Sequence, residues 1–368
     1  MIVYLTFNDH ASGVFASQVT DVVQFLRNKN KNIRLVAFIS LRNYVRERKA
    51  IRKLSANAIV LPMFPGVKNW KMNTILLRLV FLFLRPRVLM CRGIFAAHLG
   101  LKTKSPERKI VFDARGAYYA EFSEYNLVND AVFTETIKAL EKEAILKSDK
   151  CLVVSNALLN YWKEVYLLEV SSKSKVIPCT LSTKHVLTGH KVSKEEHNFS
   201  STDIVLVYSG SVAGWQSFSF LFRFLSGLLA SDERIKILFL AKNISFQGTA
   251  LEPFSHRIVI KWLNPHEVKS HLEMADYGLL IREDSVTNKV SSPTKFAEYL
   301  AAGCNVLISD NIGDFPGFVR KYGCGKVVNA PLKELTPVDR EQRLRNRELA
   351  LEHFSKEAYL GAYQYLVD

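Results

Sequence analysis

Short apolar runs alternate with amphipathic stretches along the whole chain. In the first half such runs predict strands over Ile2–Thr6, Ile33–Ile39, Ala58–Leu61, Val88–Cys91, Ile110–Asp113, Lys150–Val154 and Lys175–Ile177. In the second half they predict strands over Ile204–Tyr208, Ile235–Leu240, Arg257–Ile260, Tyr277–Ile281, Val306–Ser309 and Lys326–Val328. Strands that alternate with helical stretches form parallel, doubly wound sheets, so the pattern predicts an α/β fold.

Helical periodicity is clear in three stretches, which are about Val14–Arg27, Phe133–Ser148 and the terminal His353–Val367. A chain of 368 residues is long enough for two domains that each have their own core. We predict domains over 1–181 and 182–352 and a terminal helix in 353–368.

A polar stretch, Ser182–Asp203, separates the two sets of strands, and we place the hinge there. It contains His185, His190 and His197. Scattered histidines in a polar segment are interpreted as solvated, and we assign no metal site.

The stretch 288–317 carries the clearest chemical signal. Ser292 is expected to cap a helix that begins at Pro293 and ends at Gly303. The apolar positions of that helix, which follow i, i+3, i+4 spacing and should face the core, are Phe296, Tyr299 and Leu300. Lys295 and Glu298 then point to another side of the helix.

That other side of the helix suits an anionic ligand. The amides of a helix N-terminus, together with Ser292, Thr294 and Lys295, form a plausible seat for a diphosphate, and Glu298 lies about one turn further on, within reach of sugar hydroxyls. An ordinary capped helix with a weak Lys295–Glu298 pair fits these residues equally well. The following buried strand and its turn at 311–314 favour the ligand site, because open α/β sheets bind ligands at the carboxyl ends of their strands.

Two strands of the first half end in charged residues. One ends at Arg92, and the other ends at Asp113, with Arg115 and Glu121 after it. These side chains would meet at the carboxyl edge of the sheet. On these residues alone, an Asp–Arg pair that holds a loop is the preferred interpretation.

After the first strand comes Gly13, which allows a backbone approach to a ligand or is a simple turn glycine. A single glycine excludes the dinucleotide fingerprint.

The composition is that of a globular protein, with 48% hydrophobic residues. Five cysteines without a close pair argue against a disulfide framework or a zinc site and favour a reducing compartment. The N-terminal residues lack the features of a signal peptide, and no apolar run is long enough to span a membrane.

Basic residues are concentrated in one region. Between Val22 and Pro106 there are 18 Lys or Arg and a single acid, Glu47. This surplus of 17 exceeds the net charge of +15 of the whole chain, so the remainder carries −2. Such a region attracts anionic lipid headgroups, nucleic acid or a phosphorylated acceptor, unless it is only a solvated surface.

Apolar residues lie among these charges with helical spacing. They are Trp70, Ile75, Leu76, Leu79, Val80 and Phe83. They fit a helix at a bilayer interface or an ordinary core. Because no segment resembles a nucleic-acid-binding module, we expect peripheral membrane association and no nucleic acid partner.

The segment SSPTKFAEYLAAGCNVLISDNIGD resembles the donor-binding segment of family 4 glycosyltransferases of the GT-B fold, in particular a bacterial polysaccharide-assembly branch. The sequence FDARG followed by Glu121, and the earlier strand that ends in Arg92, are similar to features of the same branch. The resemblance runs from about Val88 to the C-terminus, and the first 87 residues fit by strand order only.

This resemblance implies two Rossmann-like doubly wound parallel-sheet domains that face each other across a cleft, with the terminal helix returning to the first. The donor-binding residues it implies are Gly13, Gly210, Ser211, Ser292, Pro293, Thr294, Lys295 and Glu298. Lys242 and Arg282 stand at strand ends and are further candidates for the positive charge beside a diphosphate, although such cations are often only solvated. The implied catalytic residues are Arg92, Asp113, Arg115 and Glu121.

The chain departs from the family pattern at two places. Many members carry a glutamate where this chain has Val290, and Glu283 is a candidate replacement. Many also carry a basic residue in or just after the glycine-rich turn, where Ser211 and Gln216 stand here.

The function that the resemblance implies is retaining transfer of a sugar from a nucleoside diphosphate donor to a lipid-linked bacterial surface glycan such as capsule, O-antigen or exopolysaccharide. No cofactor and no metal are expected. The expected location is cytoplasmic, at the inner face of the plasma membrane. Two alternatives are a nucleotide-sugar epimerase of the same fold and a non-catalytic membrane scaffold.

Overall fold

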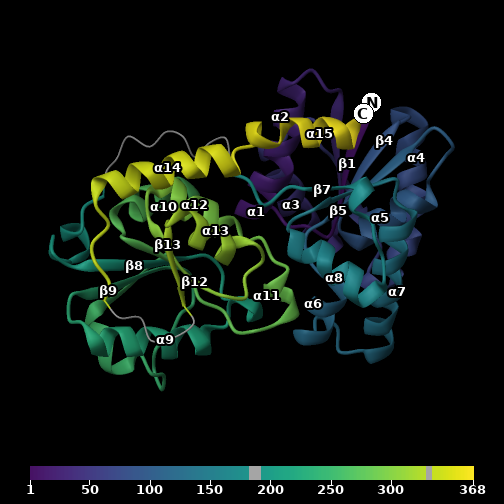
Figure 1. Cartoon of the computed structure of the whole chain (residues 1–368). Coiled ribbons are helices and arrows are strands. Elements are labelled where there is room, and N and C mark those ends of the chain that lie inside the picture. The colour runs from purple at the N-terminus through teal and green to yellow at the C-terminus, as the bar shows by residue number, and fades with distance from the viewer. Residues whose placement is uncertain (182–191, 329–333) are drawn as a thin grey trace. The chain divides into compact units, whose positions relative to one another are not determined.

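The computed structural model describes residues 1–181, 192–328 and 334–368 (Figure 1). The chain divides into two compact units, which are Met1–Ser182 together with Lys356–Asp368, and Thr183–Ser355. Residues 182–191 of the predicted hinge, including His185 and His190, lie outside the described residues.

The first unit contains a seven-stranded parallel sheet in the order β3-β2-β1-β4-β5-β6-β7. The strands are β1 Ile2–Phe7, β2 Ile33–Ser40, β3 Ile59–Met63, β4 Val88–Arg92, β5 Lys109–Ala114, β6 Lys150–Val153 and β7 Ser174–Val176. The helices of this unit are α1 Gly13–Phe15, α2 Asp21–Asn28, α3 Tyr44–Leu54, α4 Thr74–Leu84, α5 Gly93–Lys102, α6 Tyr118–Glu124, α7 Ala131–Lys147, α8 Asn156–Tyr166 and α15 Leu360–Val367.

The second unit contains a six-stranded parallel sheet in the order β10-β9-β8-β11-β12-β13. Its strands are β8 Ile204–Ser209, β9 Ile235–Leu240, β10 Ile258–Lys261, β11 Tyr277–Leu280, β12 Asn305–Ser309 and β13 Gly325–Val328. Its helices are α9 Phe218–Ser231, α10 Pro265–Met274, α11 Val286–Lys289, α12 Thr294–Ala302, α13 Phe315–Tyr322 and α14 Arg340–Phe354. In Figure 1, α9 covers one face of this sheet, and α10, α12 and α14 lie on the other.

Every strand predicted from the apolar runs is present, with ends that differ by one or two residues. The central strands are buried on both faces, as β1 and β8 are along their whole length. A strand that is covered on both faces needs apolar residues throughout, so a continuous apolar run is a reliable signal for it.

The terminal helix differs from its prediction. Instead of one helix from His353, α14 ends at Phe354, and α15 begins only at Leu360. Between them Lys356 is almost fully buried, and its ammonium donates a hydrogen bond to the carbonyl of Leu181 at 2.6 Å. The chain re-enters the first unit at this bond.

Helix α15 packs on the first unit beside α2 (Figure 1). The rings of Tyr363 and Phe25 lie 5.8 Å apart, and Leu366 and Val367 join the same buried cluster as β1 and β2. At the end of the chain Asp368 forms an ion pair with Lys31 at 2.5 Å. The last residues of the sequence therefore complete the core of the first domain.

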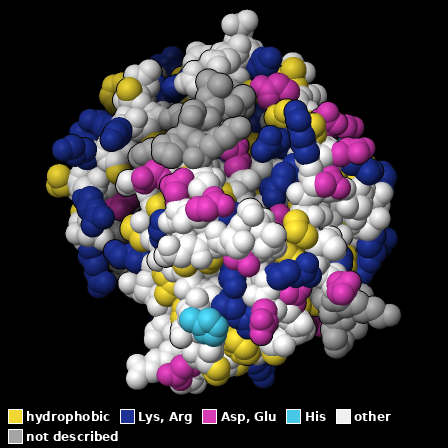
Figure 2. Space-filling view, turned by 90° about the vertical axis from the view of Figure 1, so that its left-hand side faces the viewer, with side chains coloured by type: hydrophobic (Ala, Val, Ile, Leu, Met, Phe, Trp, Pro, Cys, Tyr) yellow, Lys and Arg dark blue, Asp and Glu magenta, His cyan; other side chains and the backbone are white. Residues whose placement is uncertain are grey.

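One face of the second unit is mixed in charge. Figure 2 faces the side on which β8, β9 and α9 lie, and acidic and basic side chains are intermingled on it. This agrees with the charge count, since the basic surplus falls between Val22 and Pro106 of the first unit.

Candidate functional site

The order of the second sheet reverses between β8 and β11, which makes this point a topological switch point. Two residues of interest lie at the carboxyl ends of these two strands: Gly210 follows β8, and Arg282 lies just beyond β11. In open α/β sheets, ligands bind in the crevice at such a point. The position is set by topology before any side chain is considered.

Helix α12 starts beside this point, one residue later than predicted. It begins at Thr294, and Pro293 occupies the N-cap position with φ −66° and ψ 128°. A proline ring has no oxygen that could accept from the first amides, so the N-cap residue itself satisfies none of them. Its C-terminus is as predicted, since Gly303 adopts a left-handed φ of 89°. The amide of Cys304 donates to the carbonyl of Tyr299, and that of Gly303 to Leu300, which is a Schellman motif.

Tyr299 fixes α12 over the sheet. Its ring is fully buried and lies against Gly278 in β11, where a Cβ atom would collide with it. Its hydroxyl accepts from the amide of Ser209 at 3.1 Å and donates to the carbonyl of Leu279 at 3.4 Å. One side chain therefore ties the helix to both strands of the switch point.

Lys295 lies on the neighbouring side of the same helix and extends over Gly210. It is only 8% exposed, and its ammonium lies 3.9 Å from the centroid of the Tyr208 ring. A Cβ atom at Gly210, whose φ is +138°, would come within 2.5 Å of the Lys295 Cε atom. A glycine is required here because the lysine occupies the space of a side chain.

Arg282 is also buried, and it meets Lys295 at a single acceptor. The Gln216 side-chain carbonyl accepts from Lys295 Nζ at 3.1 Å and from Arg282 Nη2 at 3.1 Å. Arg282 Nη1 donates to Asn288 at 3.2 Å, and its backbone amide donates to the Ser309 hydroxyl at 2.9 Å. The acceptor that joins the two cations is thus the neutral amide oxygen of Gln216.

Burial and the neighbouring charges both act on the pKa of Lys295. Burial lowers the pKa of Lys295 well below its ordinary value, and the charge of Arg282 lowers it further, against an opposite effect of Glu298. Glu298 is half-buried on α12. Two buried cations that share a neutral oxygen are suited to receive an anion.

The other predicted donor residues are distributed around this pair. Ser292 is buried and Thr294 half-buried at the start of α12. Ser211 is exposed, and its carbonyl accepts from the Tyr208 hydroxyl at 2.6 Å. Lys242 is exposed, and its ammonium lies 6.0 Å from the centroid of the Trp262 ring.

The position of the missing glutamate is now visible. Val290 is buried in the core, 2% exposed. The side chain of Glu283 is exposed, while its backbone carbonyl accepts from Asn288 at 3.2 Å and Asn311 at 2.6 Å. Glu283 therefore connects α11 to the turn that contains Asn311 through its backbone.

The first unit also brings charges together at its switch point, between β1 and β4. Arg92 Nε pairs with Asp9 at 3.3 Å, and Arg92 Nη1 lies 3.9 Å from Asp113. Arg115 Nε pairs with Asp113 at 2.7 Å, and the Tyr4 hydroxyl donates to the same carboxylate. Asp113 is completely buried, so it positions Arg115 rather than contacting a ligand.

Glu121 lies on α6, close to Gly116, where a Cβ atom would collide with its carboxylate. Burial raises the pKa of Glu121 to about 7, with a further contribution from the like charges of Glu141 and Glu124. Glu141 is fully enclosed and accepts from the amides of Tyr118 and Tyr119 at 3.1 and 2.9 Å. Burial raises the pKa of Glu141 to about 7 as well.

Two further predictions concern single residues. Gly13 begins α1, and a Cβ atom there would meet open space, so no packing contact requires glycine. His197 is not solvated as expected: it is 3% exposed and packs edge-on against His271 at 5.2 Å, and burial lowers its pKa to about 4. The described part of the chain brings no three metal-binding side chains together.

Comparison of the whole chain with known proteins identifies its fold. No family model matches the chain, and no curated protein does. Among solved structures, a point mutant of TarM from S. aureus, in complex with Fondaparinux, alpha-GlcNAc-glycerol and UDP, has a TM-score of 0.69 at 10% identity, over 100% of this chain and 99% of that one. Sucrose-phosphate synthase from Thermosynechococcus elongatus has a TM-score of 0.68 at 12% identity, over 99% and 98%. This chain has the GT-B fold.

A third GT-B likeness is weaker. It is a crystal structure described as a putative UDP-N-acetylglucosamine 2-epimerase from Listeria monocytogenes, with a TM-score of 0.56 at 10% identity, over 100% of this chain and 90% of that one. A GT-B chain has one switch point in each of its two sheets, and both charged clusters described above lie at these points.

Three residues of these clusters were not singled out by the sequence as site residues. Gln216 had been noted only because it stands where relatives carry a basic residue. Asp9 comes directly after the first strand, and an acid at a strand end is a usable signal. Tyr4 gave no signal, because it lies within an apolar strand.

Proposed function

We propose that this chain is a glycosyltransferase that takes its sugar from a nucleoside diphosphate donor. The observation that carries the proposal is the pair of buried cations, Lys295 and Arg282, which share the neutral oxygen of Gln216 beside the start of α12. A diphosphate carries the negative charge that two neighbouring cations are suited to bind.

The proposed role of the pair is to stabilise the leaving group. The bond between the anomeric carbon and the diphosphate oxygen breaks, and its electron pair stays with the diphosphate. Preorganised cations and helix amides are most effective where such charge develops, which here means Lys295, Arg282 and the first turn of α12. Gly210 and Ser211 supply backbone next to the diphosphate, and Ser292, Pro293 and Thr294 form the turn above it.

Glu298 lies one turn further along α12, and its proposed role is to bind the ribose hydroxyls of the nucleoside. Lys242 and Gly13 remain secondary candidates for the donor site. Lys242 stands exposed beside Trp262, and Gly13 has free space around it.

On the acceptor side, the proposal uses the first unit. The acceptor oxygen forms the new bond to the anomeric carbon and gives up its proton to a base. Glu121 is suited to that task because its pKa of about 7 lies near neutral pH. Arg115 and Arg92 orient the acceptor, and Asp113 holds both guanidinium groups.

The finer parts of the proposal come from the resemblance to family 4 glycosyltransferases. They are retention of anomeric configuration, catalysis without a metal ion, and a lipid-linked bacterial surface glycan such as capsule, O-antigen or exopolysaccharide as acceptor. Attachment to the inner face of the plasma membrane is supported by the surplus of 17 basic residues between Val22 and Pro106.

The first experiment is a titration of the purified full chain with UDP, GDP, ADP and CMP, followed by the rise in its unfolding temperature. A ligand that binds only the native state stabilises it by mass action, so we expect one nucleotide to raise this temperature selectively. A chain that responds to none of the four would contradict the donor site and would favour the scaffold alternative.

The epimerase is the second candidate function, supported by the likeness to the epimerase structure. It would use the same cation pair but no acceptor. The two reactions are separated by incubating the chain with the matching nucleotide-sugar alone. An epimerase yields the isomeric nucleotide-sugar, whereas a transferase leaves the sugar configuration unchanged until an acceptor is added.

A further inference from the structure

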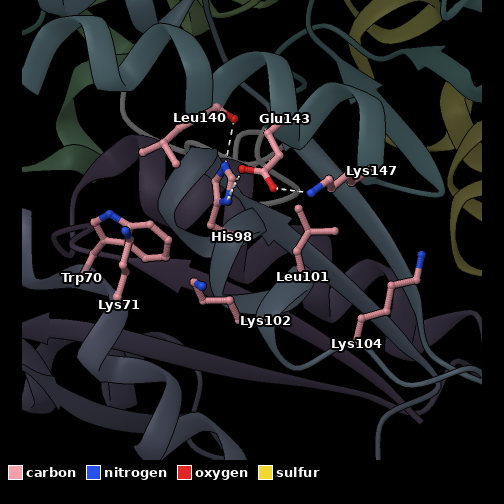
Figure 3. Close-up of a pocket in the computed structure, with 9 residues that line it drawn as sticks. All are labelled: Trp70, Lys71, His98, Leu101, Lys102, Lys104, Leu140, Glu143 and Lys147. Atoms are coloured by element: carbon pink, nitrogen blue, oxygen red, sulfur yellow. Dashed lines mark hydrogen bonds and ion pairs between the residues drawn. The ribbon is translucent and has the colours of Figure 1, made fainter.

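A basic hollow in the first unit is separate from both charged clusters. It has a volume of about 560 Å³ and is bounded by α5, α7 and the 3-10 segment Val67–Asn73 (Figure 3). Neither the proposed transfer reaction nor the resemblance assigns it a role.

The floor of the hollow is rigid and aromatic. Trp70 and His98 are 2% and 3% exposed, and their ring centroids lie 5.4 Å apart. His98 Nε2 lies 2.8 Å from the carbonyl of Leu140, which ties the floor to α7. The hollow is therefore formed by packed core residues and does not depend on a surface loop.

Four lysines surround this floor, as Figure 3 shows around His98. Lys147 pairs with Glu143 at 2.6 Å, and Lys104 pairs with Asp149 at 2.8 Å. The ammonium groups of Lys71 and Lys102 form no hydrogen bond or ion pair with any residue that the structure describes, and that of Lys71 lies 5.7 Å from the centroid of the Trp70 ring.

The charge of the hollow is consequently unbalanced. Glu143 is the single carboxylate among its lining residues, against four ammonium groups. Lys71 lies on the 3-10 segment and Lys102 at the end of α5, so the two unpaired lysines come from different elements. An anionic group with several acceptor oxygens, such as a phosphate, can be contacted by both.

The neighbouring helix α4 exposes a row of large apolar side chains. Ile75, Leu79, Leu82 and Phe83 are 61%, 52%, 66% and 86% exposed, at i, i+4, i+7 and i+8 spacing. The opposite face of the helix carries Leu77 and Phe81, which are buried in the unit. The interfacial interpretation of this stretch therefore applies to Ile75, Leu79 and Phe83, whereas Trp70 belongs to the core.

The apolar row and the hollow belong to one surface. Helix α4 follows directly after the segment that carries Lys71, and Arg78 on α4 donates to the backbone carbonyl of Lys102 at 3.3 Å. A row of exposed apolar side chains bordered by basic residues is typical of a helix that lies in a bilayer interface. A protein partner fits less well, because lysine is depleted at the centres of protein interfaces.

We propose that this surface binds an anionic phospholipid bilayer, with the apolar row of α4 in the interface and a lipid phosphate in the hollow between Lys71 and Lys102. The inference rests on the membrane attachment proposed above, and it adds the chemistry of the lipid and its place on the fold. It does not depend on the transfer of a sugar. None of the described helices combines the length and apolar character needed to cross a bilayer.

The test compares two double variants of the full chain in a vesicle flotation assay. Lys71→Gln with Lys102→Gln removes the unpaired lysines of the hollow. Lys49→Gln with Lys53→Gln makes the same change of charge on exposed positions of α3, within the same basic region. The vesicles are phosphatidylcholine alone, or phosphatidylcholine mixed with phosphatidylglycerol.

We expect the unchanged chain to prefer the vesicles with phosphatidylglycerol, and the hollow variant to lose about tenfold or more of that affinity. The α3 control should lose no more than about threefold, because dispersed surface charges are screened by salt. Equal losses in both variants would overturn the site and leave only attachment through diffuse charge. Equal binding to both vesicle types would overturn the role of the phosphate charge.

A second pair of variants tests the apolar row. Leu79→Ser with Phe83→Ser should weaken binding, whereas Val45→Ser with Val132→Ser, at positions 81% and 80% exposed on other helices, should not.

A last experiment uses glycerol phosphate in solution, without vesicles. If it protects Lys71 and Lys102 from acylation without vesicles, the hollow is a site for a soluble phosphate, and the lipid assignment is wrong.

The nucleotide titration is repeated on the hollow variant. Unchanged nucleotide binding combined with lost vesicle binding supports the lipid site independently of the donor site. A chain that binds vesicles through the hollow but binds no nucleotide would keep this inference and remove the proposed reaction.

Discussion

Both units place cations at the switch point of a parallel sheet, but they differ in what surrounds those cations. In the first unit, Arg92 and Arg115 are paired with Asp9 and Asp113. In the second unit, Lys295 and Arg282 share a neutral amide oxygen. Carboxylates that pair with buried arginines compensate their charge within the fold, whereas two cations that share a neutral oxygen would gain stability from a bound anion.

This comparison shows how a structural cluster can be separated from a binding site when both consist of buried charges. The criterion is whether removal of one charged group costs stability or costs binding. The predictions below apply it to each cluster in turn, and opposite results in the two units are expected.

The largest effect is expected for Asp113→Asn. This substitution removes the carboxylate that pairs with Arg115 and lies near Arg92, so buried positive charge is left uncompensated. The free energy of unfolding should fall by about 3–5 kcal/mol, measured by urea denaturation. Asp310→Asn removes a half-exposed carboxylate that pairs with Arg320, and it should cost at most about 1 kcal/mol. Similar losses in both variants would contradict the structural role of Asp113.

In the second unit, Lys295→Met should reduce nucleotide affinity without reducing stability. It removes a buried charge next to Arg282 but keeps an extended side chain over Gly210. The affinity for the nucleotide found in the titration should fall about a hundredfold, measured by calorimetry, because a buried charge that binds an anion is lost. The free energy of unfolding should stay equal or rise. A clear loss of stability would mean that the lysine is a structural member of the core.

Gly210→Ala changes the same site without removing a charge. The new methyl group would displace the end of Lys295, and alanine is strained at a φ of +138°. We expect roughly a tenfold loss of nucleotide affinity, with a smaller loss of stability. Gly227→Ala on α9 is the control, since a Cβ atom there meets no neighbour and alanine favours the helix. If both variants bind the nucleotide equally well, the position of Lys295 does not matter for binding.

Glu121→Gln tests a carboxyl group of the first unit whose pKa is raised by burial and by neighbouring acids. A carboxyl group whose pKa rises from 4.5 to about 7 on folding binds more protons when folded. The free energy of unfolding is then greatest below the unfolded pKa and falls as pH rises toward the folded one. The variant should flatten this decline, leaving the part due to Glu141, and Glu164→Gln, at an exposed position of α8, should not. An unchanged pH profile would contradict the raised pKa of Glu121.

The sequence predicted the strands and their ends well, and for that reason it located both clusters. Arg92, Asp113 and Arg282 were found because a charge directly after a buried apolar run stands at the carboxyl edge of a sheet. The fold class followed from the same alternation. These are local features, which the chain shows within a few residues.

Partnerships between distant residues could not be predicted in this way. Gln216 meets Arg282 and Lys295 from 66 and 79 residues away. Tyr4 reaches Asp113 across 109 residues and helps to enclose it, so a residue that was expected at a catalytic edge is inaccessible. Burial of His197 against His271 is another contact of this kind. The charge balance that separates the two clusters therefore required the structure.

The smallest predicted effect is a proton taken up when the nucleotide binds. Burial and the charge of Arg282 hold the pKa of Lys295 well below its ordinary value. A bound diphosphate favours the charged form and raises that pKa, which draws a proton from solution. Affinity should accordingly decline as pH rises. Calorimetry in buffers of different ionisation enthalpy measures the uptake directly, as a fraction of one proton per nucleotide.

Lys295→Met should abolish this proton uptake, whereas Asp113→Asn in the first unit should leave it unchanged. Equal uptake by the Met variant would assign the titration to another group and would remove the lysine from contact with the diphosphate.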